Sequence, residues 1–236
     1  MVPERAATVS RVDETPRGWH AATRRELEPL PVDVAPRLLG GLLRVESGGE
    51  IVTVRLTEVE AYHGQGTGER PDPGSHARMG PTARNATMWG EPGHLYVYLS
   101  HGIHSCVNVV CGAEGVAGGV LLRAGEVVEG RDAASRRRAA ARTDRDLARG
   151  PGRLGEAVGL RHPVHDGIDL VAPVARAGAT ATLLLLDEPL SSIARGPRVG
   201  VAGVAGTDAF PWRFWIAGDP TVSAFRWGRG AGPTSG

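Results

Sequence analysis

The sequence predicts a single domain of the α+β class, and three observations support this. Residues 51–62 alternate between apolar and other side chains, which is the pattern of a strand with one buried face. Two β-rich runs at 95–99 and 103–110 are separated by Ser100-His101-Gly102, which indicates a hairpin. Residues 129–142 are rich in Ala and Arg, which favours a helix. A length of 236 residues is enough for one domain with a substantial core.

The other elements follow from local signals. Pro31 opens a short helix, and the apolar residues 38–43 lead into the first strand. Residues 63–94 are rich in Gly, Pro and polar side chains, and an irregular segment of that length usually carries function. Further elements are expected as strands at 119–123, 168–171, 182–186 and 214–216 and as a helix at 153–158. Flexible ends are expected at 1–22 and 228–236, leaving 23–227 as the domain.

Composition describes a soluble globular protein, with 41% hydrophobic and 22% charged residues. No apolar run is long enough to cross a bilayer, so we expect no membrane partner. Residues 1–5 lack the apolar core of a secretion signal. The expected location is therefore the cytoplasm.

Cys106 and Cys111 are the only cysteines, too few for a disulfide scaffold. With His101 and His104 upstream they form a candidate zinc site. The alternative is two buried thiols in a Val-rich strand. We favour the second interpretation and expect neither a metal ion nor another cofactor.

All 27 basic residues are arginines, because the chain contains no lysine. A lysine Schiff base is therefore excluded from the mechanism. The formal net charge is only +1, but the segment from Ser135 to Arg153 carries seven arginines against two aspartates. Clustered arginines are typical of a phosphate-binding surface, and equally of a solvated helix face.

Glu60 is the residue of the 51–62 strand that most needs an explanation. The alternation predicts that it shares a face with Val54 and Leu56, where a carboxylate is costly unless it is paired or used. One interpretation is an ion pair with an arginine such as Arg123. The other is a general base that activates water.

Glu58 lies two residues earlier, on the same predicted face. Like-charge coupling is expected to raise one of the two pKa values. A glycosidase also uses two carboxylates, but it needs them on opposite sides of a sugar bond. Neighbouring positions on one strand face are too close for that, so a carbohydrate hydrolase is the weaker hypothesis.

The three tyrosines of the chain, Tyr62, Tyr96 and Tyr98, fall within forty residues of one another. They are either core residues or a stacking surface for a planar base, where each stack contributes roughly 1–3 kcal/mol. Asn108, among valines, is either a satisfied core amide or a hydrogen-bonding group that discriminates between ligands. Local pattern leaves both questions open.

Three groups of short motifs follow one another along the chain. The first contains Glu58-Val-Glu60-Ala-Tyr62, Ser75-His76-Ala77, Thr82-Ala-Arg84-Asn85, Met88-Trp89 and Pro92-Gly93. The second contains Tyr96-Val-Tyr98, Gly102, Asn108 and Leu121-Leu122-Arg123, and the third Gly150-Pro-Gly-Arg153-Leu154, Pro197-Arg198-Val199-Gly200 and Pro211-Trp-Arg-Phe214. This series, over roughly residues 25–225, resembles the bacterial alkyladenine (3-methyladenine) DNA glycosylase family. An ordered set is far more specific than one motif.

The resemblance implies a curved antiparallel β-sheet flanked by helices, with a protruding β-hairpin. It also implies an enzyme that flips an alkylated purine out of double-stranded DNA and hydrolyses its N-glycosidic bond. Glu60 matches the general base of that family, and Arg123 the residue that holds the attacking water with it. The implied substrates are 3-methyladenine and 7-methylguanine, with hypoxanthine and ethenoadenine as further candidates.

The resemblance also assigns the base pocket. Tyr62 and Tyr98 match its aromatic walls, and His76 matches the histidine on the opposite side. Asn108 matches the amide that rejects the exocyclic amino group of guanine. A cationic alkylated purine would stack favourably on such electron-rich rings.

The hairpin tip departs from the family. His101 stands where the family commonly has Tyr as the wedge that fills the gap left by the flipped base, and Trp89 often corresponds to Phe. We assign His101 the wedge role with a weaker apolar contribution. Phosphate contacts are assigned to Arg84, Arg153 and Arg198. Without lysine, the enzyme is expected to be monofunctional. We also expect a monomer that binds double-stranded DNA. The alternative class is a non-catalytic DNA binder.

Overall fold

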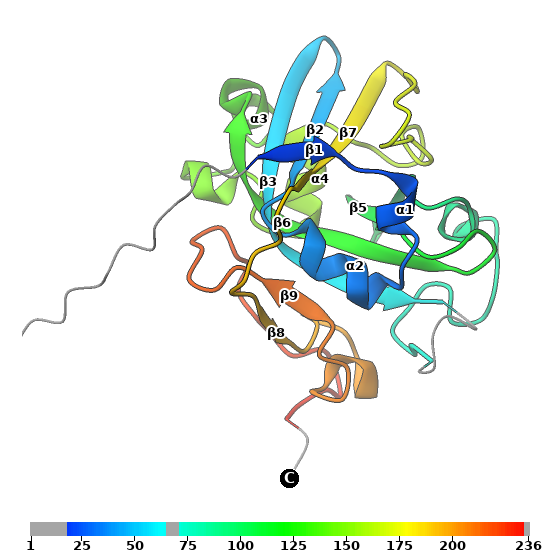
Figure 1. The fold of residues 1–236 in the computed structure, drawn as a ribbon. Coiled ribbons are helices and arrows are strands. Elements are labelled where there is room, and N and C mark those ends of the chain that lie inside the picture. The colour runs from blue at the N-terminus through cyan, green and yellow to red at the C-terminus, as the bar shows by residue number, and fades with distance from the viewer. Residues whose placement is uncertain (1–17, 65–70, 234–236) are drawn as a thin grey trace, which may run out of the picture.

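The computed structural model describes residues 18–64 and 71–233. Within them, nine strands form one antiparallel sheet in the order β1-β7-β2-β3-β6-β5-β4, with β9 on β3 and β8 on β9 (Figure 1). The strands are β1 (Trp19–Ala21), β2 (Leu42–Ser47), β3 (Glu50–His63), β4 (Leu95–Ser100), β5 (His104–Val110), β6 (Gly118–Glu129), β7 (Ala179–Leu186), β8 (Ala194–Gly196) and β9 (Arg213–Trp215). The α+β fold class is confirmed.

The helices are short and pack against the sheet. They are α1 (Arg24–Leu27), α2 (Pro31–Leu38), α3 (Arg131–Arg137) and α4 (Pro151–Val158), with 3₁₀ turns η1 (Ala86–Trp89), η2 (Asp144–Asp146) and η3 (Gly203–Gly206). Both α2 and α4 begin with a proline, whose missing N–H is no loss in a first turn. Helix α4 lies against β5 and β6, and α2 lies against β3 (Figure 1).

Strand β3 runs through the whole domain and changes face in the middle. The main core contains Leu56 and then Val59 and Ala61, so the buried positions switch from even to odd residue numbers. The cause is a β-bulge, seen as register shifts against β6 between Leu56 and Glu58 and between Glu58 and Val59. Simple alternation therefore predicted the wrong face for Glu58 and Glu60. Both carboxylates point away from the main core.

The hairpin of β4 and β5 forms one edge of the sheet, with its register set by pairs such as Tyr96 with Asn108. His101 occupies the left-handed region with φ 50°, followed by Gly102 with φ 70°. Residues 101–104 are all exposed. The predicted hairpin is present, and its tip faces solvent.

Helix α3 begins later than the predicted 129–142, because residues up to 129 still belong to β6, and it ends earlier, at Arg137. Its arginines are occupied within the protein. Arg136 and Arg137 pair with Glu50, and Arg138 donates to Glu156 at 2.6 Å. These contacts favour the structural interpretation over phosphate binding for Arg136, Arg137 and Arg138.

Other predicted boundaries also differ. Residues 19–21 of the expected N-terminal arm form β1 and pair with β7 through Trp19 and Leu186, while residues 1–17 lie outside the described part. The predicted strand at 168–171 is wrong; its main ladder contact is one bridge between His94 and Asp169. The expected flexible tail is held at residue 229, whose carbonyl accepts from Gly203 N at 3.0 Å. Residues 234–236 are not described.

None of the helices in the described ranges is long and apolar enough to span a membrane.

Candidate active site

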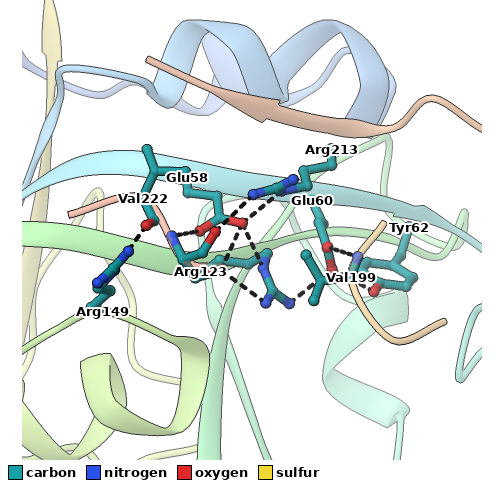
Figure 2. A network of polar contacts seen from close by, with 9 residues as sticks. Glu58, Glu60, Tyr62, Arg123, Arg149, Val199, Arg213 and Val222 are labelled. Atoms are coloured by element: carbon teal, nitrogen blue, oxygen red, sulfur yellow. Dashed lines mark hydrogen bonds and ion pairs between the residues drawn. The ribbon is translucent and has the colours of Figure 1, made fainter. Parts of the chain in front are cut away.

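Glu60 lies on β3, fully buried, with both carboxylate oxygens occupied (Figure 2). Val199 N donates to Oε1 at 2.7 Å. The Tyr62 hydroxyl donates to Oε2 at 2.8 Å, and Arg123 Nη1 donates to the same oxygen at 3.3 Å. Within residues 18–64 and 71–233, the carboxylate thus has a single cation at ion-pair distance, and this contact is the longest of the three.

Glu58, two residues earlier, is also fully buried but bound more heavily. Its Oε1 accepts from Arg213 Nε at 2.7 Å, Arg123 Nε at 3.0 Å and Ser223 Oγ at 3.0 Å, while Oε2 accepts from Ser223 N at 2.7 Å. Burial raises the pKa of this carboxyl, but Arg123, Arg213 and Ser223 outweigh burial and hold the pKa below its usual value. The rise in pKa expected for one of the two carboxyls from like-charge coupling therefore does not occur at Glu58.

Arg123 bridges the two carboxylates and is itself buried, with 7% of its surface exposed (Figure 2). Burial lowers the pKa of a guanidinium, but Glu60 and Glu58 outweigh it and raise the pKa of Arg123 well above its usual range. The residue is therefore a permanent cation between two acids. Both interpretations of Glu60 remain compatible with this geometry, because an ion pair with Arg123 is present.

Next to Glu60 is a cavity of about 400 Å³, within the range of roughly 300–1,000 Å³ typical of small-molecule pockets. It brings together four residues predicted for the base pocket, Tyr62, His76, Tyr98 and Asn108. The remaining lining residues are Pro73, Gly74, Arg78, Met88, Tyr96, Val201 and Ala202. Glu60 reaches this cavity through the Tyr62 hydroxyl.

The aromatic side chains form a graded wall, from the exposed His76 through the half-buried Tyr98 to the buried Tyr96. The Tyr96 and Tyr98 rings stack with centroids 5.6 Å apart, and His76 meets Tyr98 edge-on at 4.5 Å. No planar base fits between His76 and Tyr98 in this arrangement, because they are already in contact. A bound base would lie beside that pair or displace His76.

Two polar groups at the buried end of the cavity have defined states. Asn108 Nδ2 donates to the Tyr96 carbonyl at 3.0 Å, which orients the amide. Burial raises the pKa of Tyr96 to about 12, so its hydroxyl keeps its proton. Among the described residues that buried hydroxyl has no hydrogen-bond partner. Tyr96 is thus a candidate donor that the base-pocket prediction had omitted.

His76 is expected to be neutral at neutral pH. Partial removal from water lowers the pKa of its imidazole, and the nearby Arg84 and Arg78 lower it further. A neutral ring beside the cavity does not repel a cationic base.

The three arginines predicted to contact phosphate fall into two classes. Arg84 and Arg153 are exposed, as that role requires. Arg198 is fully buried, and its guanidinium binds both oxygens of Asp72 at 2.7 Å. Phosphate contact by Arg198 is therefore wrong. The motif position suggested a charge on a loop, but the loop folds inward.

Arg198 instead supports the site from behind. It donates to the carbonyl of Ala61 at 3.0 Å, and its guanidinium carbon lies 4.4 Å from the centre of the Tyr62 ring. The next residue, Val199, supplies the N–H to Glu60. Sequence reasoning missed the Val199 N–H as a partner of Glu60, and it missed Asp72, because no local pattern distinguished either residue.

The candidate zinc site has no counterpart in the described residues, which contain no group of three or more His, Cys, Asp or Glu able to hold an ion. Cys106 and Cys111 are buried free thiols. Burial raises the pKa of Cys111 further from the range of a metal-binding thiolate.

A buried carboxylate paired with an arginine beside an aromatic cavity fits a hydrolase that acts on a planar ligand. Comparison with known proteins gives the family: a sequence model of methylpurine-DNA glycosylase matches residues 25–220. The chain belongs to the methylpurine-DNA glycosylase family, and its enzyme class is DNA glycosylase, a hydrolase of N-glycosyl bonds.

Relatives are named as candidate 3-methyladenine DNA glycosylases. One from Leifsonia xyli is 52% identical over 199 residues, covering 83% of this chain and 88% of the relative. One from Nocardia farcinica is 52% identical over 202 residues, covering 85% and 90%. One from Streptomyces avermitilis is 48% identical over 204 residues, covering 86% and 91%. The resemblance inferred from the ordered motifs is confirmed.

Proposed function

We propose that this enzyme flips alkylated purines, 3-methyladenine and 7-methylguanine above all, out of duplex DNA and hydrolyses their N-glycosidic bonds. Hypoxanthine and ethenoadenine are the further candidate substrates. The observation that carries the proposal is the Glu60 carboxylate, buried beside the aromatic cavity and oriented by Val199 N, Tyr62 and Arg123. A structural acid alone would not require a ligand-sized space next to it.

In this mechanism a water molecule binds between Glu60 and Arg123, where the present contact is loosest at 3.3 Å. Glu60 accepts a proton from the water while the water oxygen forms a bond to C1′ of the deoxyribose. The bond between C1′ and the purine nitrogen breaks, and its electron pair leaves with the base. A cationic alkylated purine departs neutral, and the product is an abasic site.

The pocket residues select and hold the base. Tyr62 and Tyr98 supply ring faces, and His76 in its neutral form closes the rim without opposing a cationic purine. Asn108, oriented by the Tyr96 carbonyl, disfavours unmodified guanine through its exocyclic amino group, and 7-methylguanine is released in spite of the same group because its positive charge makes it a better leaving group. His101 at the exposed hairpin tip enters the gap in the helix, and Arg84 and Arg153 contact phosphates.

The absence of lysine supports a monofunctional enzyme, because lyase chemistry on the abasic product uses an amine nucleophile. Monomeric state and cytoplasmic location are further predictions. Size-exclusion chromatography with light scattering checks the first, and cell fractionation checks the second.

The test is release of methylated purines from alkylated duplex DNA by the unmutated protein and by Glu60→Gln. We expect 3-methyladenine or 7-methylguanine from the unmutated protein and almost none from the variant. Binding to abasic DNA without any base release would favour the non-catalytic binder. Release by Glu60→Gln at the unmutated rate would remove Glu60 as the base.

The wedge assignment has its own test in His101→Tyr. A larger apolar ring fills the gap better, so affinity for duplexes with an abasic-site analogue is expected to increase several-fold. Fluorescence anisotropy measures the dissociation constant, with the exposed Arg25→Ala as control. Unchanged affinity would take His101 out of the wedge role.

A further inference from the structure

The segment from Val222 to Arg229, called here the C-terminal strap, lies beside the active site without a role in the mechanism above. Its first residues are hydrogen-bonded to Arg149 and to Glu58 of the carboxylate network (Figure 2). Arg149 Nε donates to the Val222 carbonyl at 2.9 Å, and Ser223 donates to Glu58 through both N and Oγ. The start of the strap is therefore fixed relative to the two carboxylates.

Its later residues are fastened to the wall of the cavity. Gly200 N donates to the carbonyl of Arg226 at 2.9 Å, and Gly203 N donates to the carbonyl of Arg229 at 3.0 Å. The residues between these two glycines, Val201 and Ala202, line the cavity. The strap thus runs beside the cavity-lining segment.

Close packing explains a glycine at position 228. A Cβ there would lie 2.0 Å from the Val201 carbonyl oxygen, far inside contact distance, so only glycine lets the two backbones approach this closely. The strap is held against the cavity wall by its backbone. The side chains of Phe225, Arg226, Trp227 and Arg229 are exposed, although the centre of the Phe225 ring also lies 5.6 Å from the Arg213 guanidinium carbon.

Those side chains are exposed and of two kinds. Phe225 and Trp227 have 39% and 38% of their surfaces exposed and meet edge to face at 4.9 Å. Arg226 and Arg229 are exposed, and within the described ranges neither has a carboxylate at ion-pair distance. Other exposed arginines, such as Arg142 and Arg145, also lack an ion pair in the described chain, so the strap is distinguished by the aromatic rings that alternate with its arginines and by its place beside the cavity wall.

We propose that the C-terminal strap is a second DNA-contact surface, which binds the sugar-phosphate backbone of the duplex next to the flipped nucleotide. Arg226 and Arg229 neutralise phosphates, and Phe225 and Trp227 pack on deoxyribose. The inference rests on the proposed function, since docking of the damaged or abasic nucleotide at the adjacent cavity is what brings the duplex to the strap. Unpaired cations interleaved with exposed aromatic rings suit a nucleic-acid backbone better than an apolar protein surface.

The test is the salt dependence of binding to a duplex with a tetrahydrofuran abasic-site analogue. The slope of log K against log salt is negative, and each phosphate contact adds about 0.9 to its magnitude. R226A/R229A is therefore expected to reduce that magnitude by about 1.8. Between 50 and 200 mM salt the unmutated protein then loses about 12-fold more affinity than the variant. The matched control is R25A/R44A, whose arginines lie on α1 and β2 and are likewise without an ion pair in the described chain.

The aromatic pair gives an independent arm. Trp227→Ala is expected to weaken binding several-fold with no change in the salt slope, because it removes contact without removing charge. A slope for R226A/R229A equal to that of the control pair would overturn the inference, as would a Trp227→Ala variant with full affinity. Base release by the unmutated protein is measured in parallel. Its failure would count against the proposed function, whereas an unchanged slope with normal release counts against the strap alone.

Discussion

Glu58 and Glu60 stand two residues apart on one strand, equally buried, yet their surroundings differ in kind. Glu58 accepts from two guanidinium groups and twice from Ser223, so its charge is fully matched. Glu60 has one guanidinium at 3.3 Å, a tyrosine hydroxyl and one backbone N–H. A carboxylate that exchanges a proton with water needs the smaller number of charged partners, which is the arrangement around Glu60. The comparison indicates that partners, more than burial, separate a structural acid from a catalytic one.

The largest expected effect is on the rate of base release in Glu60→Gln. Loss of a general base costs about 10²- to 10⁴-fold, while the amide keeps the size of the side chain. Single-turnover excision measures the rate, and thermal unfolding checks that the variant folds. If Glu58→Gln lost as much rate with unchanged stability, the distinction between the two acids would fail.

Glu58→Gln is expected to act on stability. Removing one charge of a buried network leaves Arg213 without its ion-pair partner, and breaking such a pair costs about 3–5 kcal/mol in the free energy of unfolding. Urea unfolding measures it. Glu46→Gln, on an exposed acid of β2 without an ion pair in the described chain, is the control and should change stability by less than about 0.5 kcal/mol.

The pH dependence of stability sharpens the same contrast. The pKa of Glu58 is lower in the folded state than its usual value of 4.5, so its contribution to stability is complete above pH ~5 and is lost as pH falls through the folded-state pKa. The stability difference between the unmutated protein and Glu58→Gln should therefore shrink below pH ~4.5. A difference that stays constant down to pH ~3 would contradict the depressed pKa.

The smallest effect is expected from Tyr62→Phe, which removes the 2.8 Å hydrogen bond to Glu60 but leaves a ring for stacking. A hydrogen bond from a neutral donor to a charged group contributes about 1.5–3 kcal/mol, and a water molecule can replace part of that contribution. We expect a rate change of about tenfold or less, with affinity for abasic DNA nearly unchanged. A loss as large as that of Glu60→Gln would assign Tyr62 a role in the proton transfer itself.

Much of the site was predictable because its residues follow one another in short motifs. Tyr62, His76, Tyr98 and Asn108 were singled out, and they do line one cavity. Their meeting required the hairpin, the β3 strand and the loop after it to fold as expected. Their individual roles stay predictions.

The failures come from long-range geometry. The bulge after Leu56 inverted the faces of β3, and no local pattern marks an extra residue in a ladder. The motif around Arg198 predicted a surface charge, but the side chain is buried against Asp72, which is distant in the sequence. The Glu58 network depends on Ser223, 165 residues away.

The sequence by itself determined the family and the fold class, and it predicted a pairing of Glu60 with Arg123 that the structure contains. These are encoded in ordered motifs and in the types of side chain that such chemistry requires. Only the tertiary structure decided which of two neighbouring acids is saturated and which arginines are buried. It also decided which segment borders the cavity. Those properties depend on contacts between residues far apart in the chain, where burial and charge are set by neighbours that local sequence does not specify.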